Sequence, residues 1–132
     1  MPVELIRAPA LSDDVPYAYA ALVERGSLVF TAGACPLDDA GEVVAPGDYA
    51  AQAQVVMDNL VVALAVSGCT LADVAKSTVY VVGTDRDDLV AAWQVVRAAF
   101  GDHDAPSTLL GVAMLGYPDQ LVEVEAIAVR HA

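Results

Sequence analysis

The chain has 132 residues, which suits one domain with a single hydrophobic core. Its formal charge is −12 with six lysines and arginines, a balance that excludes a broad phosphate-binding surface, so no nucleic-acid partner is expected. The chain is 57% hydrophobic and 18% charged, below the typical charged share of about 25%, so we expect self-association to cover apolar surface.

The sequence gives no sign of a membrane segment or a metal site. The longest apolar run, residues 60–66, is far shorter than the roughly 20 residues that a membrane helix needs, and the N-terminus lacks a signal-peptide pattern. Cys35 and Cys69 lie far apart with no ligand-spaced histidine, which predicts two reduced, largely buried thiols. We therefore expect a soluble cytoplasmic protein without a membrane partner.

The N-terminal third predicts strands. Strands are expected at residues 2–8 and 17–24, joined by a polar, proline-bearing link, and a third, short and buried, at 27–31. The density of Asp, Gly and Pro at residues 37–47 predicts a surface loop.

The middle of the chain alternates helices with a strand. Asp48 can cap a helix that runs over 48–66, and a capping-box spacing at 70–73 predicts one helical turn before a strand at 76–82. A second box-like start opens a helix at 84–100, whose apolar stripe predicts that Trp93 lies in the core.

The C-terminal part predicts a hairpin of two strands, at 105–115 and 121–129. Period-2 alternation in the second strand places Glu123 and Glu125 on one face together with three aliphatic residues. That face is too apolar for solvent and too acidic for a sealed core, so we expect it to meet another subunit at a wet cleft.

This order of elements predicts one α+β domain over residues 1–132, with a mixed sheet of about six strands and both helices packed on one face. The uncovered face would be an unusually large apolar patch for a monomer. Association around a symmetry axis would bury it.

Short segments along nearly the whole chain match the pattern of one known family. They read Pro-Tyr at 16–17, Phe-Thr-Ala-Gly at 30–33, Asp-Asn-Leu at 58–60, Gly at 68 and Asp-Val at 73–74 before Lys-Ser-Thr-Val-Tyr at 76–80, and Val-Glu-Val-Glu-Ala-Ile-Ala at 122–128. Together they resemble the reactive intermediate deaminase (Rid) family, also called the YjgF family. The resemblance implies a chorismate-mutase-like fold and a homotrimer with small-molecule clefts between subunits. It also implies cofactor-free hydrolysis of 2-imino and 2-enamino acids, such as 2-iminobutanoate and 2-iminopropanoate, to 2-oxo acids and ammonia.

The chain departs from this pattern at the substrate anchor. Deaminase members carry an arginine at the start of the next-to-last strand that grips the substrate carboxylate, and Ser107, or Thr108 under a one-residue shift, stands there in this chain. The lost contacts are hydrogen bonds to a charged group, worth about 1.5–3 kcal/mol each, so we expect 2-imino acids to bind poorly. Ala32 and Gly33 begin a segment that has also lost polar groups of the family pattern.

Two residues keep the family pattern. The resemblance implies that Glu123 positions the attacking water and that Tyr17 lies at the substrate, and a carboxylate in a partly apolar cleft suits general acid–base catalysis. Two alternatives stay open: Glu123 pairs with a donor of a neighbouring subunit and fixes the trimer register, and Tyr17 is a packed strand aromatic. The expected substrate-binding residues are Tyr17, Ala32, Gly33, Ser107 and Thr108.

Two other polar features are weaker candidates. The run at 102–104, Asp-His-Asp, is interpreted as a solvated loop, because sequence neighbours rarely form a triad or a metal site. Arg97 lies at helical spacing from Trp93 and could replace the missing cation if its face reached the cleft.

Three hypotheses follow. The first is a hydrolase, similar to an imine or enamine deaminase, that uses Glu123 and no cofactor. The second is a non-catalytic trimer that binds a metabolite in the same cleft. The third is an endoribonuclease or translation inhibitor, an activity attached to parts of the family, which the scarcity of cations disfavours.

Overall fold

The computed structural model describes residues 3–131, and these contain six strands and two α-helices in the expected order. The expected strand at 2–8 is confined to three residues, and its residue 2 lies outside the described range. The elements are β1 (Glu4–Ile6), β2 (Ala20–Leu22), β3 (Ser27–Phe30), α1 (Tyr49–Val66), the one-turn helix η1 (Leu71–Asp73), β4 (Val74–Val82), α2 (Arg86–Phe100), β5 (Ser107–Val112) and β6 (Val122–Arg130).

The predicted helix starts agree with the local hydrogen bonds. The side chain of Asp48 accepts a hydrogen bond from the backbone of Ala51 at the start of α1, and the capping box at η1 is present. Helix α2 begins at Arg86, two residues after the expected start at 84, and its N-cap is Asp85 rather than Thr84.

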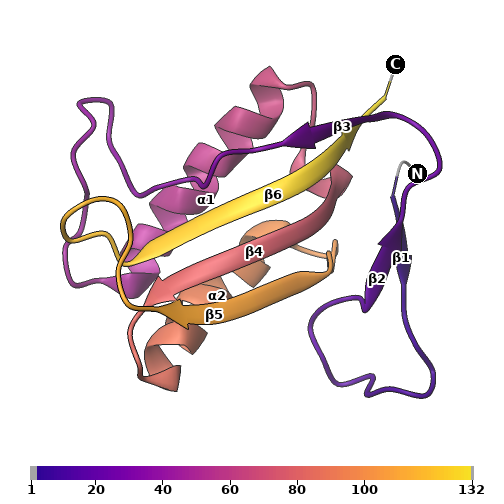
Figure 1. The fold of residues 1–132 in the computed structure, drawn as a ribbon, viewed down its shortest axis with the longest axis horizontal. Helices are drawn as coiled ribbons and strands as arrows, with labels where there is room; N and C mark the ends of the chain where they lie inside the picture. The colour runs from indigo at the N-terminus through magenta and orange to yellow at the C-terminus, as the bar shows by residue number, and fades with distance from the viewer. Residues whose placement is uncertain (1–2, 132) are drawn as a thin grey trace.

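Strands β3, β6, β4 and β5 form a mixed sheet in that order, and both helices pack on one of its faces (Figure 1). This confirms the predicted α+β class and the placement of the helices. Strands β1 and β2 pair with each other as a separate hairpin beside the main sheet, whereas a single sheet of about six strands was expected.

The expected C-terminal hairpin is wrong in its pairing. Strand β5 runs parallel to β4, and β6 pairs antiparallel with β4 on the other side, so β4 separates the two strands. Helix α2 provides the crossover that a parallel β4–β5 pair requires. The connection from β5 to β6 passes over the end of β4, and the two strands it joins are two strand spacings, or about 10 Å, apart.

The core lies between the helices and the sheet. On β6 the residues that face the helices are fully or almost fully buried, and a fully buried Val or Leu side chain contributes about 1.5–3 kcal/mol. Among residues 3–131, one helix, α1, is long and apolar enough to cross a membrane when only its length and composition are considered. Its buried stripe packs on the sheet, as in the core helix of a globular domain: Gln52, Ala53, Val56, Met57, Leu60 and Leu64.

The second face of the sheet, called the open face below, has no helix on it. Glu123, Glu125 and Ile127 alternate with the buried residues of β6 and are half-buried, as predicted. On β3, Leu28 and Phe30 are 53% and 69% exposed. A single chain therefore shows an uncovered surface in which aliphatic and aromatic side chains surround carboxylates.

A buried amide connects α1 to the segment that enters β6. Gln52 is fully buried; its Nε2 donates to the carbonyl of Asp119 at 2.9 Å, and its Oε1 accepts from the backbone N–H of Leu121 at 2.7 Å. These bonds fix the backbone on both sides of Gln120, two residues before β6 begins.

Replacing Gln52 with Leu should lower the free energy of unfolding by about 2 kcal/mol, because it leaves backbone groups without partners in a buried place. Urea denaturation at one fixed protein concentration measures this difference. Gln54→Leu is the matched control: Gln54 is exposed and bonds to Asp58 on the same helix, so its loss should change stability by less than about 0.5 kcal/mol. Equal stability of the two variants would contradict the assigned role of Gln52.

Candidate functional site

A cluster of side chains surrounds the carboxyl group of Glu123, near the start of β6. Cys35 Sγ lies 3.3 Å and Gln120 Nε2 lies 3.1 Å from the same oxygen, Glu123 Oε1. Gly33 packs against the other side of the group, so closely that a Cβ at this position would overlap the carboxyl. We call these four residues the carboxylate cluster: Gly33, Cys35, Gln120 and Glu123.

The segment after β3 is held against β6 by its backbone. Ala34 and Val124 exchange two backbone hydrogen bonds, of 2.7 and 3.2 Å. From α1, Asn59 Nδ2 donates to the carbonyls of Cys35 and Leu37 at 2.9 and 3.1 Å. Asn59 thus sets the position of Cys35, a role that sequence patterns did not reveal.

Cys35 is a hydrogen-bond donor in this cluster. Its burial, together with the hydrogen bond to Glu123 and the charge of that carboxylate, raises the pKa of the Cys35 thiol from 9.0 to about 11. The thiol therefore keeps its proton at neutral pH and is a poor nucleophile. Both cysteines are free thiols, as predicted; Cys69 is buried and Cys35 is half-buried.

A cleft of about 460 Å³ lies at the free edge of β5. Helix α2 contributes Trp93, which packs on the core, as expected, and also lines this cleft, which was not expected. We call it the edge cleft, and its lining is Pro16, Tyr17, Trp93, Ser107, Thr108 and Leu109.

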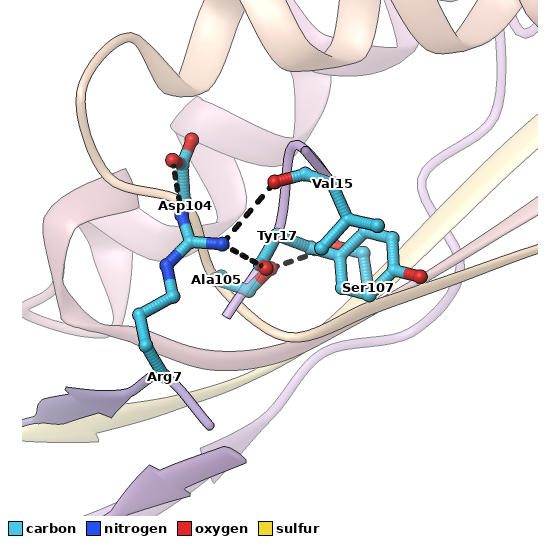
Figure 2. A network of polar contacts seen from close by, with 6 residues as sticks. All are labelled: Arg7, Val15, Tyr17, Asp104, Ala105 and Ser107. Atoms are coloured by element: carbon cyan, nitrogen blue, oxygen red, sulfur yellow. Dashed lines mark hydrogen bonds and ion pairs between the residues drawn. The ribbon is translucent and has the colours of Figure 1, made fainter. Parts of the chain in front are cut away.

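Arg7 ties the loop that carries Tyr17 to the residues before β5 (Figure 2). Arg7 Nη2 forms an ion pair with Asp104 Oδ2 at 2.8 Å, and Arg7 Nη1 donates to the carbonyls of Val15 and Tyr17. The backbone N–H of Ala18 donates to the carbonyl of Asp104 at 2.8 Å. The carbonyl of Tyr17 thus serves this network instead of a strand, so β2 begins later than expected.

The Asp-His-Asp run is more than the solvated loop expected from the sequence. His103 Nε2 lies 2.7 Å from the carbonyl of Val74, and Asp104 binds Arg7. Within residues 3–131, no group of three or more His, Cys, Asp or Glu side chains could hold a metal ion. The run therefore connects the segment before β5 to the first residue of β4, through His103, and to Arg7, through Asp104.

The two residues at the anchor position have different surroundings. Ser107 is half-buried, and its Oγ contacts Ser77 Oγ of the adjacent strand. Thr108 is exposed, and its Oγ1 accepts a hydrogen bond of 2.7 Å from Lys76 Nζ. Arg97 reaches this neighbourhood, where it lines a small cavity together with Trp93 and Ser107.

A single chain does not bring the predicted site residues together. Glu123 lies opposite Tyr80 in the β4–β6 register, whereas Ser107 lies opposite Ser77 in the β4–β5 register. This corresponds to roughly 10 Å along the strands and about 10 Å across two strand spacings. Glu123 and Gly33 thus lie in the carboxylate cluster, with Ala32 next in the chain, and Tyr17, Ser107 and Thr108 lie in the edge cleft.

Comparison with known proteins identifies the family. Residues 10–130 match the family model described as Endoribonuclease L-PSP. The chain is 34% identical to the putative reactive intermediate deaminase TdcF of Escherichia coli K12, over 98% of this chain and 97% of TdcF. It is 35% identical to the 2-iminobutanoate/2-iminopropanoate deaminase of E. coli K12, over 82% and 84% of the two chains. The chain belongs to the Rid (YjgF) family.

Solved structures of Rid proteins confirm the fold. The Rid-family protein YyfB of Yersinia pestis, described as of unknown function, is similar with a TM-score of 0.91 at 31% identity, over 98% and 99% of the chains. E. coli TdcF with bound serine gives a TM-score of 0.68 at 32% identity, over 99% of both chains.

The raised pKa of Cys35 predicts slow alkylation in the folded protein. In a Cys69→Ala background at pH 8, iodoacetamide should modify Cys35 at least about tenfold more slowly than it does in the same chain unfolded in urea, because the thiolate fraction falls tenfold per pKa unit. Mass spectrometry of timed samples gives the rate, which should keep rising above pH 9. A rate that reaches its plateau below pH 9 would contradict the hydrogen-bonded thiol.

Proposed function

We propose that this Rid-family protein hydrolyses an imine or enamine at clefts between copies of the chain, with Glu123 as the base that positions water. The observation that carries the proposal is the carboxylate cluster. Both donors, Cys35 and Gln120, bind Oε1 of Glu123, and the other oxygen, Oε2, lies against Gly33 without a hydrogen-bond donor among residues 3–131. In the proposed mechanism Oε2 accepts the hydrogen bond from water. A half-buried carboxylate with a fixed orientation suits general base catalysis.

The proposed reaction needs one base and no cofactor. Water adds to the carbon of the C=N bond as its proton passes to Glu123, and the carboxyl group then protonates the nitrogen. The resulting carbinolamine collapses to the carbonyl product and ammonia. The TdcF and 2-iminobutanoate/2-iminopropanoate deaminase relatives support this reaction class by their names.

The proposal requires self-association, and the family resemblance implies a homotrimer. The separation of the carboxylate cluster from the edge cleft within one chain supports it, because a second copy could place its own half of the site opposite the first. The exposed Leu28 and Phe30 on the open face also support it, since association would remove their apolar surface from water. A cytoplasmic location of the assembled protein is part of this proposal.

The substrate we propose does not depend on a bidentate grip on its carboxylate. Ser107 at the anchor position offers a hydroxyl that already contacts Ser77, and a hydroxyl cannot form the paired bonds of a guanidinium. The 2-imino acids that the arginine-bearing members hydrolyse should therefore be poor substrates.

Glu123→Gln should reduce ammonia release from an imine substrate by about 10²- to 10⁴-fold, because the amide cannot accept the proton of water. Glu125→Gln is the matched control, since Glu125 lies two residues further on the same face and accepts a hydrogen bond from Tyr80 at 2.9 Å. The control should keep its activity within a few-fold of wild type. Full activity of Glu123→Gln would remove this residue from the mechanism.

Ser107→Arg should raise the rate of 2-iminobutanoate hydrolysis at least about tenfold, because one recovered hydrogen bond to a charged group is worth about 1.5–3 kcal/mol. The comparison uses 2-iminobutanoate formed in situ, with ammonia release as the readout. Ser107→Met, which adds length without charge, should show no gain. If Ser107→Arg folds and is no faster than wild type, the pocket differs from the deaminases in more than its anchor.

A non-catalytic metabolite-binding protein is the second candidate, and the composition of the edge cleft favours it. Pro16, Trp93 and Leu109 offer apolar contacts that can bind a ligand but cannot transfer a proton. This candidate predicts saturable binding without product, and isolation of a converted product would end it. Ribonuclease activity ranks third, because the family model's description supports it and the charge of −12 does not.

A further inference from the structure

Lys76 is a cation on the open face that has no carboxylate partner within residues 3–131 of the single chain. It belongs to β4, is half-buried, and its Nζ donates to Thr108 Oγ1 at 2.7 Å. Among residues 3–131 the one ion pair is Arg7–Asp104, so Lys76 is not paired in a chain that has 18 Asp and Glu residues. The position of Lys76 is therefore not explained by an internal salt bridge.

The Thr108 hydroxyl is neutral and satisfies only one of the three hydrogen-bond donors of the Lys76 ammonium group, which lies at an exposed place beside the cleft wall. An anionic ligand would supply the missing charge. Lysine is a common binder of carboxylates and phosphates as a point charge, without the fixed fork of arginine. The environment of Lys76 thus favours an external anion.

The edge cleft is where such an anion would lie. Thr108 forms part of the cleft wall and accepts a hydrogen bond from Lys76, so the ammonium group lies one hydrogen bond away from a residue of the wall. The remainder of the ligand would contact the aromatic and apolar part of the same wall, which includes Tyr17 and Trp93. The charged contact and the apolar contacts together favour a ligand that carries one anionic group and one apolar substituent.

We propose that Lys76 is the cation of the edge cleft, where it binds the anionic group of a small carboxylate beside Thr108 while Trp93 contacts the ligand's apolar substituent. This inference deepens the proposed function, because it assigns a substrate class to the same site. It places the charge on the strand next to the anchor position rather than at Ser107. A single ammonium group accepts a carboxylate in many orientations, so the apolar contact with Trp93 selects among ligands.

The test uses the fluorescence of Trp93, which is the chain's one tryptophan and lies in the cleft wall. The full-length protein in its native assembly is titrated with hexanoate and with hexanamide, a neutral probe of nearly the same shape. Wild type should bind hexanoate at least about tenfold more tightly than hexanamide, the ratio expected from one charge-assisted hydrogen bond. It should also bind hexanoate more tightly than acetate, which lacks the apolar chain.

Two neutral variants and two controls assign the preference to Lys76. Lys76→Met and Lys76→Gln should each bind hexanoate and hexanamide equally, and the second variant serves if the first does not fold. Lys76→Arg should keep the preference for hexanoate. Arg25→Met changes the net charge by the same amount at an exposed turn and should also keep it. Circular dichroism confirms that each variant is folded.

Equal binding of the two probes by wild type, or a preference that persists in a folded neutral variant of Lys76, would overturn the inference. Imine hydrolysis by wild type, measured beside the titrations, separates this result from the proposed function. If wild type shows the Lys76-dependent preference but hydrolyses no imine, the anion site stands and the proposed hydrolysis fails. If wild type hydrolyses an imine but shows no preference, the anion site alone fails.

Discussion

The central position of β4 is the constraint on which the arrangement of the site depends. Strand β4 pairs in parallel with β5 and antiparallel with β6, so the strand that carries Ser107 cannot adjoin the strand that carries Glu123. Ser107 and Glu123 also lie opposite different residues of β4, Ser77 and Tyr80, so the edge cleft and the carboxylate cluster are offset along the strand direction. Chemistry that needs both parts must use two copies of the chain, and this links the proposed activity to self-association rather than to the fold of one protomer.

Within one protomer, the carboxylate cluster is assembled by the packing of loops on rigid elements. Helix α1 holds the loop after β3 through Asn59 and the turn before β6 through Gln52. Cys35 and Gln120, which these loops carry, then orient Glu123. A site built in this way keeps its geometry because its supports, the buried Gln52 and the half-buried Asn59, belong to one helix, although Cys35 and Gln120 lie in irregular segments.

Local periodicity predicted the order of the elements and the two faces of β6, but the expected burial of β3 was wrong, because three of its four residues are exposed in the single chain. The alternation in β6 assigned Glu123 and Glu125 to the open face, because strand side chains point to opposite faces with a period of two. The same alternation cannot say which strand is the neighbour, and the expected hairpin was therefore wrong. Arg7 and Asp104 were missed because they lie 97 positions apart. Lys76, which we propose as the cation of the edge cleft, was not considered from the sequence, because a cation was sought only at positions 107 and 108 and on α2.

The contact between Gly33 and Glu123 limits how such a chain can evolve. There is no room for a side chain at position 33 while the carboxyl group of residue 123 occupies its present place. Alanine becomes acceptable at 33 when residue 123 shortens or turns away. In diverging descendants of this chain, loss of the acid and loss of the glycine should therefore appear as paired substitutions, with the acid changing first.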